Sequence, residues 1–185
     1  MLERLGKLVS SAPETVPAAL VISGLAYDSR AVAPGNAFFC IPGSKTDGNQ
    51  FAQAAIDAGA SCIFSEQPQQ LAVPCVNVTD VRLALAEVAD SFYDHPSKKM
   101  RLIGVTGTNG KTTTTHLIEH ILQYAGKKVA LIGTLGARWD EGGQRQYKDI
   151  KHTTPQASEL QQMLSEMAQR GVTHTAMEVS SHALA

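Results

Sequence analysis

The most informative part of the sequence is Leu102-Ile-Gly-Val-Thr-Gly-Thr-Asn-Gly-Lys-Thr-Thr-Thr114. An apolar run of strand length over 102–106 leads directly into glycines, and a helical pattern follows over 112–124. Glycines let successive backbone N–H groups point into one concavity, and the helix adds its own unpaired N–H groups and the positive end of its dipole. This arrangement predicts a nucleotide-phosphate loop in which Lys111 reaches the β and γ phosphates and the Thr112 hydroxyl ligates Mg²⁺.

The loop departs from the commonest phosphate-loop pattern at one position. The pattern G-x-x-x-x-G-K-[ST] requires a glycine at position 105, where this chain has Val105, flanked by Gly104 and Gly107. The departure argues against a GTPase or an ordinary ATPase. The simpler interpretation, a glycine-rich turn from strand to helix with an exposed lysine, stays open at this point.

The rest of the second half alternates strands and helices. Strands are expected at 128–135 and 175–179, a helix at 157–169, and a polar, glycine-containing excursion at 139–151. The helix after the loop carries Leu117, Ile118, Ile121 and Leu122, which we expect on one buried face. Such alternation predicts a parallel, right-handed α/β sheet. A sheet of three parallel strands normally has further covering elements, so we expect this half to be incomplete. If Ala185 is a genuine terminus, we expect the open edge of the sheet to favour self-association.

The first half has its own α/β pattern. Apolar runs at 37–41 and 62–64 have strand length, and 51–58 and 81–92 have helical spacing, the second capped by Asp80. A polar, proline-containing segment at 94–99 separates the halves. The predicted fold class is therefore α/β, with a small N-terminal α/β domain at 1–99 followed by the first part of a P-loop parallel-sheet domain at 100–185.

Composition excludes several classes of protein. The formal net charge of −1 argues against binding of nucleic acid through bulk charge. The longest apolar stretch near the N-terminus, 16–25, is interrupted by Pro17 and Gly24 and is too short for a membrane span or a secretory signal. An odd number of cysteines, 3, without a CxxC pair is typical of reduced thiols. We expect a cytoplasmic protein with no nucleic-acid or membrane partner.

The motif at 106–113 resembles the ATP loop of the Mur ligases and of folylpolyglutamate synthases. Three other motifs favour the Mur ligases, and among them those that add the third amino acid of the peptidoglycan precursor. They are Tyr27-Asp-Ser-Arg30 with Pro34-Gly35 and 38–43, then His152-Thr-Thr-Pro155, then Met177-Glu-Val-Ser-Ser-His182.

The resemblance implies an ATP-dependent amide ligase that works through an acyl phosphate, with ATP and Mg²⁺ as cofactors and Lys111 as a catalytic residue that offsets phosphoryl charge. It implies ATP binding by Gly107, Thr108, Asn109, Gly110, Lys111, Thr112 and Thr113; uridine-substrate binding by Tyr27, Ser29, Ser44, Lys45 and Thr46; UDP-N-acetylmuramoyl-dipeptide contacts from Thr153, Thr154 and Ser180; and Mg²⁺ binding by Thr112 and Glu178. The amino-acid co-substrate, diaminopimelate or lysine, is selected in this family by a C-terminal domain that the sequence does not contain. We therefore expect a truncated chain that binds substrate without turning over.

Each implied role has an alternative in local structure. Ser29 also fits a turn, 44–46 an ordinary polar loop, Thr153 and Thr154 the start of a helix, and Glu178 a surface carboxylate. His152 stands where the best-matching relatives are expected to have asparagine, and His182 has no assigned role. For the whole chain, the alternatives are a folylpolyglutamate synthase-like ligase and a non-enzymatic module that binds a cell-wall precursor.

Overall fold

The structure is a computed structural model that describes residues 3–4, 20–43, 46–150 and 153–181. The chain divides into two compact units, Met1–Phe92 and Tyr93–Ala185. The division lies next to the polar segment 94–99, where Asp94 and His95 have positive φ angles. None of the described helices combines the length and the apolar character that a bilayer crossing requires.

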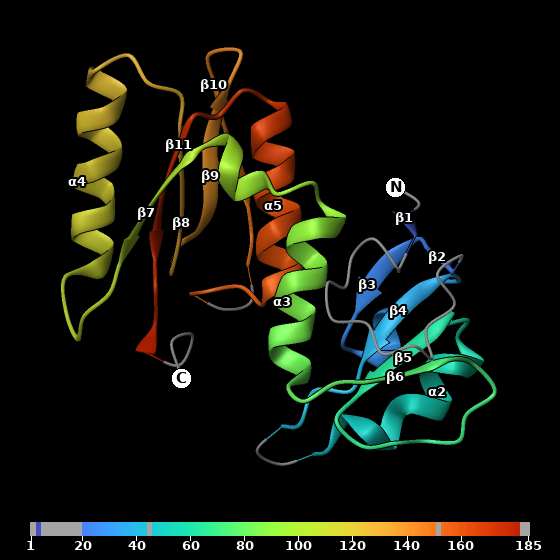
Figure 1. Ribbon diagram of the computed structural model, residues 1–185. Helices are drawn as coiled ribbons and strands as arrows, with labels where there is room; N and C mark the ends of the chain where they lie inside the picture. Colours follow the sequence, from blue (N-terminus) through green and yellow to red (C-terminus); the bar gives the residue numbers. More distant parts are fainter. Residues whose placement is uncertain (1–2, 5–19, 44–45, 151–152, 182–185) are drawn as a thin grey trace. The chain divides into compact units, whose positions relative to one another are not determined.

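The first unit contains a four-stranded parallel sheet. Its strands lie in the order β3, β4, β5, β6, which is also their order in the chain (Figure 1). Their bounds are Gly24–Ala26, Asn36–Phe39, Cys62–Ser65 and Cys75–Asn77, and a separate antiparallel pair joins β1 (Glu3–Arg4) to β2 (Val21–Ile22). Both strands that we predicted here are therefore present.

Apolar side chains cover both faces of this sheet. Phe38 and Ile63 belong to one cluster with the alanines of α2 (Ala52–Asp57), while the neighbouring Phe39 and Phe64 stack with ring centroids 4.3 Å apart. This alternation follows from the period of two in a β-strand. Its described residues also form η1 (Ser29–Ala31), η2 (Gly48–Phe51) and α3 (Val81–Phe92).

The cap predicted for α3 is confirmed. The carboxylate of Asp80 accepts hydrogen bonds from the N–H groups of Arg82 at 2.8 Å and Leu83 at 2.9 Å. These contacts satisfy two of the backbone donors that a helix leaves unpaired at its start.

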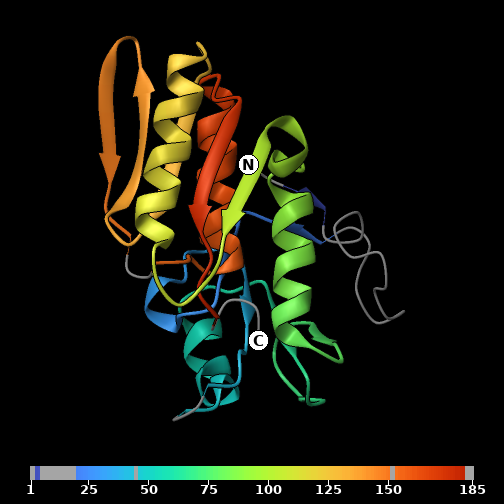
Figure 2. The same cartoon turned by 90° about the vertical axis from the view of Figure 1, so that its left-hand side faces the viewer.

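The second unit contains a five-stranded sheet in the order β10, β9, β8, β11, β7. Strands β7, β11 and β8 run parallel, as the sequence predicts, and Figures 1 and 2 show α4 and α5 on opposite faces of the sheet. The elements are η3 (Pro96–Lys99), β7 (Arg101–Val105), α4 (Lys111–Tyr124), β8 (Val129–Gly133), β9 (Gly136–Glu141), β10 (Gln144–Lys148), α5 (Ala157–Gln169) and β11 (His174–Glu178).

The polar excursion expected at 139–151 is instead an antiparallel hairpin that extends the sheet. Strand β9 pairs with β8 and with β10, and Trp139 of β9 is buried against α5. The hairpin turns at Gly142 and Gly143, whose φ angles of 58° and 82° are those that a two-residue hairpin loop requires.

The buried face of α4 also differs from the prediction. Thr115 and Glu119 are fully buried and Ile118 and Leu122 are half-buried, whereas Leu117 and Ile121 are 58% and 66% exposed. The helix is therefore rotated about its axis relative to the expected orientation. The reason is that the Glu119 carboxylate pairs with Arg138 and Arg145 of the hairpin.

Candidate functional site

The candidate residues of the second unit gather at the carboxyl ends of three parallel strands. The phosphate loop follows β7, Thr134 follows β8, and Glu178 is the last residue of β11. Open parallel sheets bind their ligands at this end, because the loops that leave the strands meet there. The arrangement brings together residues that are distant in sequence, such as Thr112 and Glu178, which are 66 positions apart.

The loop at 106–110 is exposed and its shape depends on two glycines. Gly107 has a φ of 145°, and Gly110 has a φ of 81° at the residue that precedes α4. These left-handed backbone angles are readily adopted only by glycine. The Lys111 ammonium donates a hydrogen bond to the Gly107 carbonyl at 2.6 Å, so the lysine folds back across the loop. An anion in the loop would meet this ammonium and the first N–H groups of α4.

The carboxylate of Glu178 lies beside the loop and is 1% exposed. Its Oε2 atom accepts hydrogen bonds from the hydroxyls of Thr112 at 3.1 Å and Thr134 at 3.0 Å. Its Oε1 atom accepts from the backbone N–H of Thr134 at 3.1 Å. The interpretation of Glu178 as a surface carboxylate is therefore wrong, because the side chain is buried and held by donors from α4 and from the end of β8.

The substrate-segment residues lie at the same end of the sheet. The Thr154 hydroxyl donates to the carbonyl of Glu178 at 3.1 Å, accepts from the N–H of Ser180 at 3.0 Å, and lies 3.4 Å from the Ser180 hydroxyl. The Thr153 hydroxyl lies 3.3 Å from that of Thr134. Thr153, Thr154 and Ser180 thus form one group with Glu178, whereas helix α5 begins only at Ala157.

The candidate residues of the first unit follow the carboxyl ends of its own strands. Tyr27 and Ser29 come directly after β3, and the turn that contains Thr46 comes after the adjacent parallel strand β4. In that turn the N–H of Gly43 donates to the Thr46 carbonyl at 3.0 Å. Ser44 and Lys45, like His152 and His182 of the other unit, lie outside the described residues.

The charges in the Tyr27–Arg30 motif are already paired. Asp28 accepts from the Arg30 side chain at 2.9 and 2.7 Å and from its backbone N–H at 3.0 Å. This exposed hydrogen-bonded pair raises the pKa of the Arg30 guanidinium. The contact to the backbone caps η1, so the motif stabilises the turn that carries Ser29.

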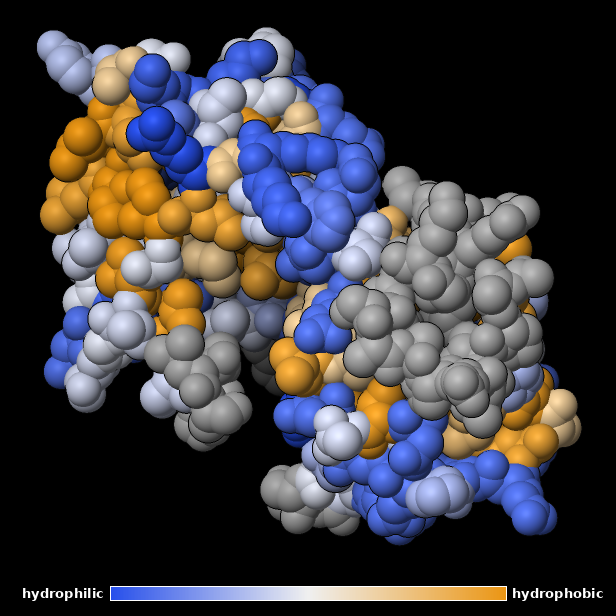
Figure 3. Space-filling view, in the orientation of Figure 1, coloured by the Kyte–Doolittle hydropathy of each residue, from blue (hydrophilic) through white to orange (hydrophobic). Residues whose placement is uncertain are grey.

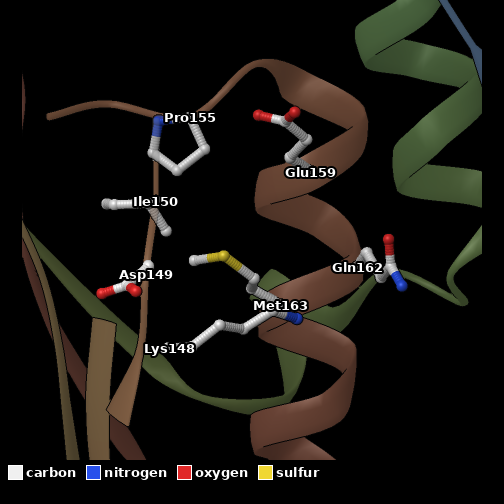
Figure 4. Close-up of a pocket in the computed structure, with 7 residues that line it drawn as sticks. All are labelled: Lys148, Asp149, Ile150, Pro155, Glu159, Gln162 and Met163. Atoms are coloured by element: carbon white, nitrogen blue, oxygen red, sulfur yellow. The ribbon is translucent and has the colours of Figure 1, made fainter. Parts of the chain in front are cut away.

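A pocket of about 190 Å³ lies elsewhere in the second unit, between the segment after β10 and helix α5 (Figure 4). Met163 points from α5 toward Ile150 and Pro155. The charged residues Lys148 and Glu159 also line the pocket. This volume is small for a nucleotide, since ligand pockets usually measure about 300–1,000 Å³. The seven lining residues include none of the candidate residues.

Thr134 is the residue of this site that the sequence analysis missed. It contributes two of the three hydrogen bonds that the Glu178 carboxylate accepts from described residues, yet it belongs to none of the recognised motifs. A signal existed: Thr134 is a hydroxyl residue that directly follows a buried strand of a parallel sheet, which is where site residues of such sheets are found. Within the described residues, no group of three or more His, Cys, Asp or Glu side chains is placed to hold a metal ion by itself.

Comparison with family models covers both units. Residues 105–185 match the model described as "Mur ligase middle domain", and residues 21–93 match the model described as "Mur ligase family, catalytic domain".

Curated relatives carry one recurring name, UDP-N-acetylmuramoyl-L-alanyl-D-glutamate–2,6-diaminopimelate ligase. The relative from Geobacillus thermodenitrificans is 49% identical over 163 residues, which are 88% of this chain and 32% of that protein. The relative from Synechocystis is 43% identical over 202 aligned residues, which cover 98% of this chain and 39% of that protein. The chain thus spans about a third of the length of the curated relatives it matches.

Solved structures agree on the fold. A structure with the same ligase name has a TM-score of 0.79 and 28% identity, and the match covers 100% of this chain and 37% of that one. The MurF ligase from Thermotoga maritima, solved in complex with ADP, has a TM-score of 0.58 at 19% identity, which supports likeness of fold alone.

Proposed function

Because the chain belongs to the Mur ligase family, we propose that it forms the part of an ATP-dependent ligase that binds the uridine substrate and the nucleotide. The reaction is the addition of the third amino acid to UDP-N-acetylmuramoyl-L-alanyl-D-glutamate. The names of the relatives favour 2,6-diaminopimelate as that amino acid. The observation that carries the proposal is the buried Glu178 carboxylate, which lies within hydrogen-bond distance of Thr112 at the phosphate loop.

ATP binds at residues 107–113 in this proposal. Gly107 and Gly110 allow the backbone to curve, and the start of α4 supplies N–H donors and a positive dipole end. Lys111 exchanges its contact with the Gly107 carbonyl for the β and γ phosphates. It is the catalytic residue of this chain, because its charge offsets the charge of the transferring phosphoryl group.

The residues present fit an Mg²⁺ ion. The Glu178 carboxylate is buried, and among the described residues its hydrogen-bond partners are hydroxyl and amide donors rather than a cation. A buried carboxylate without a cation is costly, and Mg²⁺ prefers one or two carboxylate or hydroxyl ligands together with substrate phosphates. Thr112 and Glu178 would hold the ion, which would supply positive charge to the phosphates of ATP.

The muramoyl-dipeptide binds beside this metal site, at Thr153, Thr154 and Ser180. Thr154 is hydrogen-bonded to the Glu178 carbonyl and to Ser180, and the Thr153 hydroxyl lies 3.3 Å from that of Thr134. These contacts keep three hydroxyl groups close to Glu178, so the substrate carboxylate would lie near the γ-phosphate. We propose that this carboxylate attacks the γ-phosphate, that ADP leaves, and that the amine of the incoming amino acid then displaces phosphate from the acyl phosphate. The protein acts by positioning and charge stabilisation, without a protein nucleophile.

The uridine diphosphate part of the substrate binds to the first unit in this proposal. Tyr27 and Ser29 follow β3, and the turn that contains Thr46 follows the adjacent parallel strand β4, so both come after the carboxyl ends of neighbouring strands. Hydroxyls, a lysine and loop amides suit a diphosphate. We assign this role to 1–99 and nucleotide binding to 100–185.

We also propose a cytoplasmic location without a nucleic-acid or membrane partner. The three cysteines are free thiols, which is typical of a reducing compartment, and the formal net charge of −1 offers no bulk attraction for nucleic acid.

Calorimetric titration of the chain with UDP-N-acetylmuramoyl-L-alanyl-D-glutamate tests the proposal, with UDP and a folate as comparators. We expect the muramoyl ligand to bind more tightly than UDP, and Thr154→Ala and Ser29→Ala each to weaken it about tenfold by removing a hydrogen bond to a charged group. Absence of binding by both uridine ligands, or preference for the folate, would contradict the proposal.

A further inference from the structure

Thr134 holds the Glu178 carboxylate from two sides. Its backbone N–H donates to Oε1 at 3.1 Å and its hydroxyl donates to Oε2 at 3.0 Å. Two donors from one residue fix the plane of a carboxylate, whereas Thr112 contributes a single hydroxyl contact at 3.1 Å. If Thr112 turned its hydroxyl oxygen toward a metal ion, Thr134 would still hold Glu178 in place.

The Thr134 hydroxyl also faces the substrate segment. A hydroxyl carries one proton and two acceptor sites, so Thr134, which donates to Glu178, is left to accept from the Thr153 hydroxyl 3.3 Å away. The three side chains form a directed series from Thr153 through Thr134 to Glu178. This series joins the segment after β10 to the end of β11.

We propose that Thr134 is a positioning residue that orients Glu178 for the Mg²⁺–nucleotide complex and connects that carboxylate to the Thr153 side of the site. The proposal rests on the proposed function, because it takes Glu178 as the metal carboxylate. Partners that hydrogen-bond to a ligating carboxylate orient it, and their loss typically lowers metal affinity about 10–100-fold.

The test measures how much Mg²⁺ improves ATP binding, by titrating the chain with ATP in Mg²⁺ and again in EDTA. Thr134→Val is nearly isosteric, keeps the backbone N–H and removes the hydroxyl, whereas Thr134→Ser restores the hydroxyl. We expect the Mg²⁺-dependent gain in affinity to fall at least tenfold in Thr134→Val and to stay within about twofold of the original in Thr134→Ser. Affinity in EDTA should be equal in all three proteins.

A double-mutant cycle with Glu178→Gln tests whether Thr134 acts through that carboxylate. Thr134→Val should add no further loss to Glu178→Gln. An unchanged Mg²⁺-dependent gain in Thr134→Val, an equal loss in Thr134→Ser, additive losses in the cycle, or a matching loss in EDTA would each overturn the positioning role while the proposed function stands. Failure of the unmodified chain to bind ATP in Mg²⁺ would overturn both.

Discussion

At residue 133 a glycine leaves room for the Glu178 carboxylate. A Cβ atom at this position would lie 2.8 Å from Cδ of Glu178 and 2.9 Å from its Cγ. Contacts this short force a displacement, and hydrogen bonds from Thr112 and Thr134 already hold the carboxylate. We therefore predict that Gly133→Ala lowers ATP affinity in Mg²⁺ at least tenfold, measured by calorimetry, because it displaces the carboxylate that we propose as an Mg²⁺ ligand.

Gly104→Ala is the matched control for this substitution. Gly104 belongs to the parallel strand β7, but its added Cβ would meet only a Val179 methyl at 3.2 Å, which a small side-chain movement relieves. ATP affinity should stay within about threefold of the original. Equal losses in both variants would show that strand glycines matter for folding rather than for the position of Glu178.

Two buried thiols make stability depend on pH. Burial raises the pKa of Cys40 and of Cys62 to about 12 from 9.0, and burial also raises the pKa of Tyr93. Above pH 9 the unfolded chain releases thiol protons that the folded chain keeps, so the free energy of unfolding falls as pH rises toward the folded-state value. We predict a loss of about 1 kcal/mol per buried thiol between pH 8 and pH 10, measured by urea denaturation under reducing conditions.

The Cys62→Ala variant separates this effect from other titrations. This variant should have a lower free energy of unfolding than the original at pH 8, because replacing the buried cysteine with the smaller alanine reduces packing. It should lose less of that free energy between pH 8 and pH 10, because the titrating thiol of Cys62 is absent. An identical loss in both proteins would assign the pH dependence to groups other than the thiol of Cys62.

At the scale of elements, α4 is attached to the β9–β10 hairpin by a buried cluster of charges. Glu119 of α4 is fully buried and pairs with Arg138 of β9 and, at 2.9 Å, with Arg145 of β10. The hydrogen bond from Arg138 to this carboxylate raises the pKa of the guanidinium. The cluster explains why Glu119 faces the sheet and apolar residues of the same helix face solvent.

Removing the carboxylate should be costly, because it leaves two arginines without their shared partner. We predict that Glu119→Ala lowers the free energy of unfolding by about 3 kcal/mol in urea denaturation. It should also increase proteolysis at the hairpin turn formed by Gly142 and Gly143.

A second ion pair of the same hairpin provides the control. Glu141 pairs with Arg170, but both side chains are partly exposed, at 42% and 40%. Glu141→Ala should therefore cost less than about 1 kcal/mol. Similar costs for the two glutamates would mean that burial does not decide the strength of these pairs.

At the scale of the whole molecule, the second unit presents an open sheet edge and an apolar surface. Within the described residues, β7 pairs only with β11, so its other edge carries unpaired backbone groups. Leu117, Ile121 and Tyr124 of α4 are 58%, 66% and 97% exposed, and Figure 3 shows hydrophobic residues gathered over this region. Open edges and exposed apolar patches are both sites of association.

We predict that the chain self-associates at micromolar to millimolar concentration through this surface, as measured by sedimentation velocity. The double substitution Ile121→Lys with Tyr124→Lys should shift the distribution toward monomer by at least tenfold in the dissociation constant. Tyr147→Lys, at the opposite edge strand β10 where Tyr147 is 68% exposed, should leave it unchanged. A monomer at all concentrations would contradict the prediction.

Local features of this protein were determined by the sequence alone. The glycines around Lys111, the Asp80 cap and the strand–helix alternation each depend on residues a few positions apart, so propensity and hydrogen-bonding chemistry specify them. The order of strands and helices also predicted a parallel sheet, with the phosphate loop after one strand and Glu178 at the carboxyl end of another. The glycine pair at 142–143 held a readable hairpin signal that the polar composition of 139–151 obscured.

The tertiary structure decided what depends on neighbours distant in sequence. Thr134 became part of the site only because β8 and β11 are adjacent, which brings its hydroxyl to a carboxylate 44 positions away. The orientation of α4 was decided by Glu119, since a buried charge must meet its partners and arginines 19 and 26 positions away provide them. The helical periodicity of the sequence indicates which face is more apolar, but it contains no information about those arginines. The free energy needed to bury a charge without its partners exceeds that of exposing two apolar side chains, so the position of the arginines decides which face is buried.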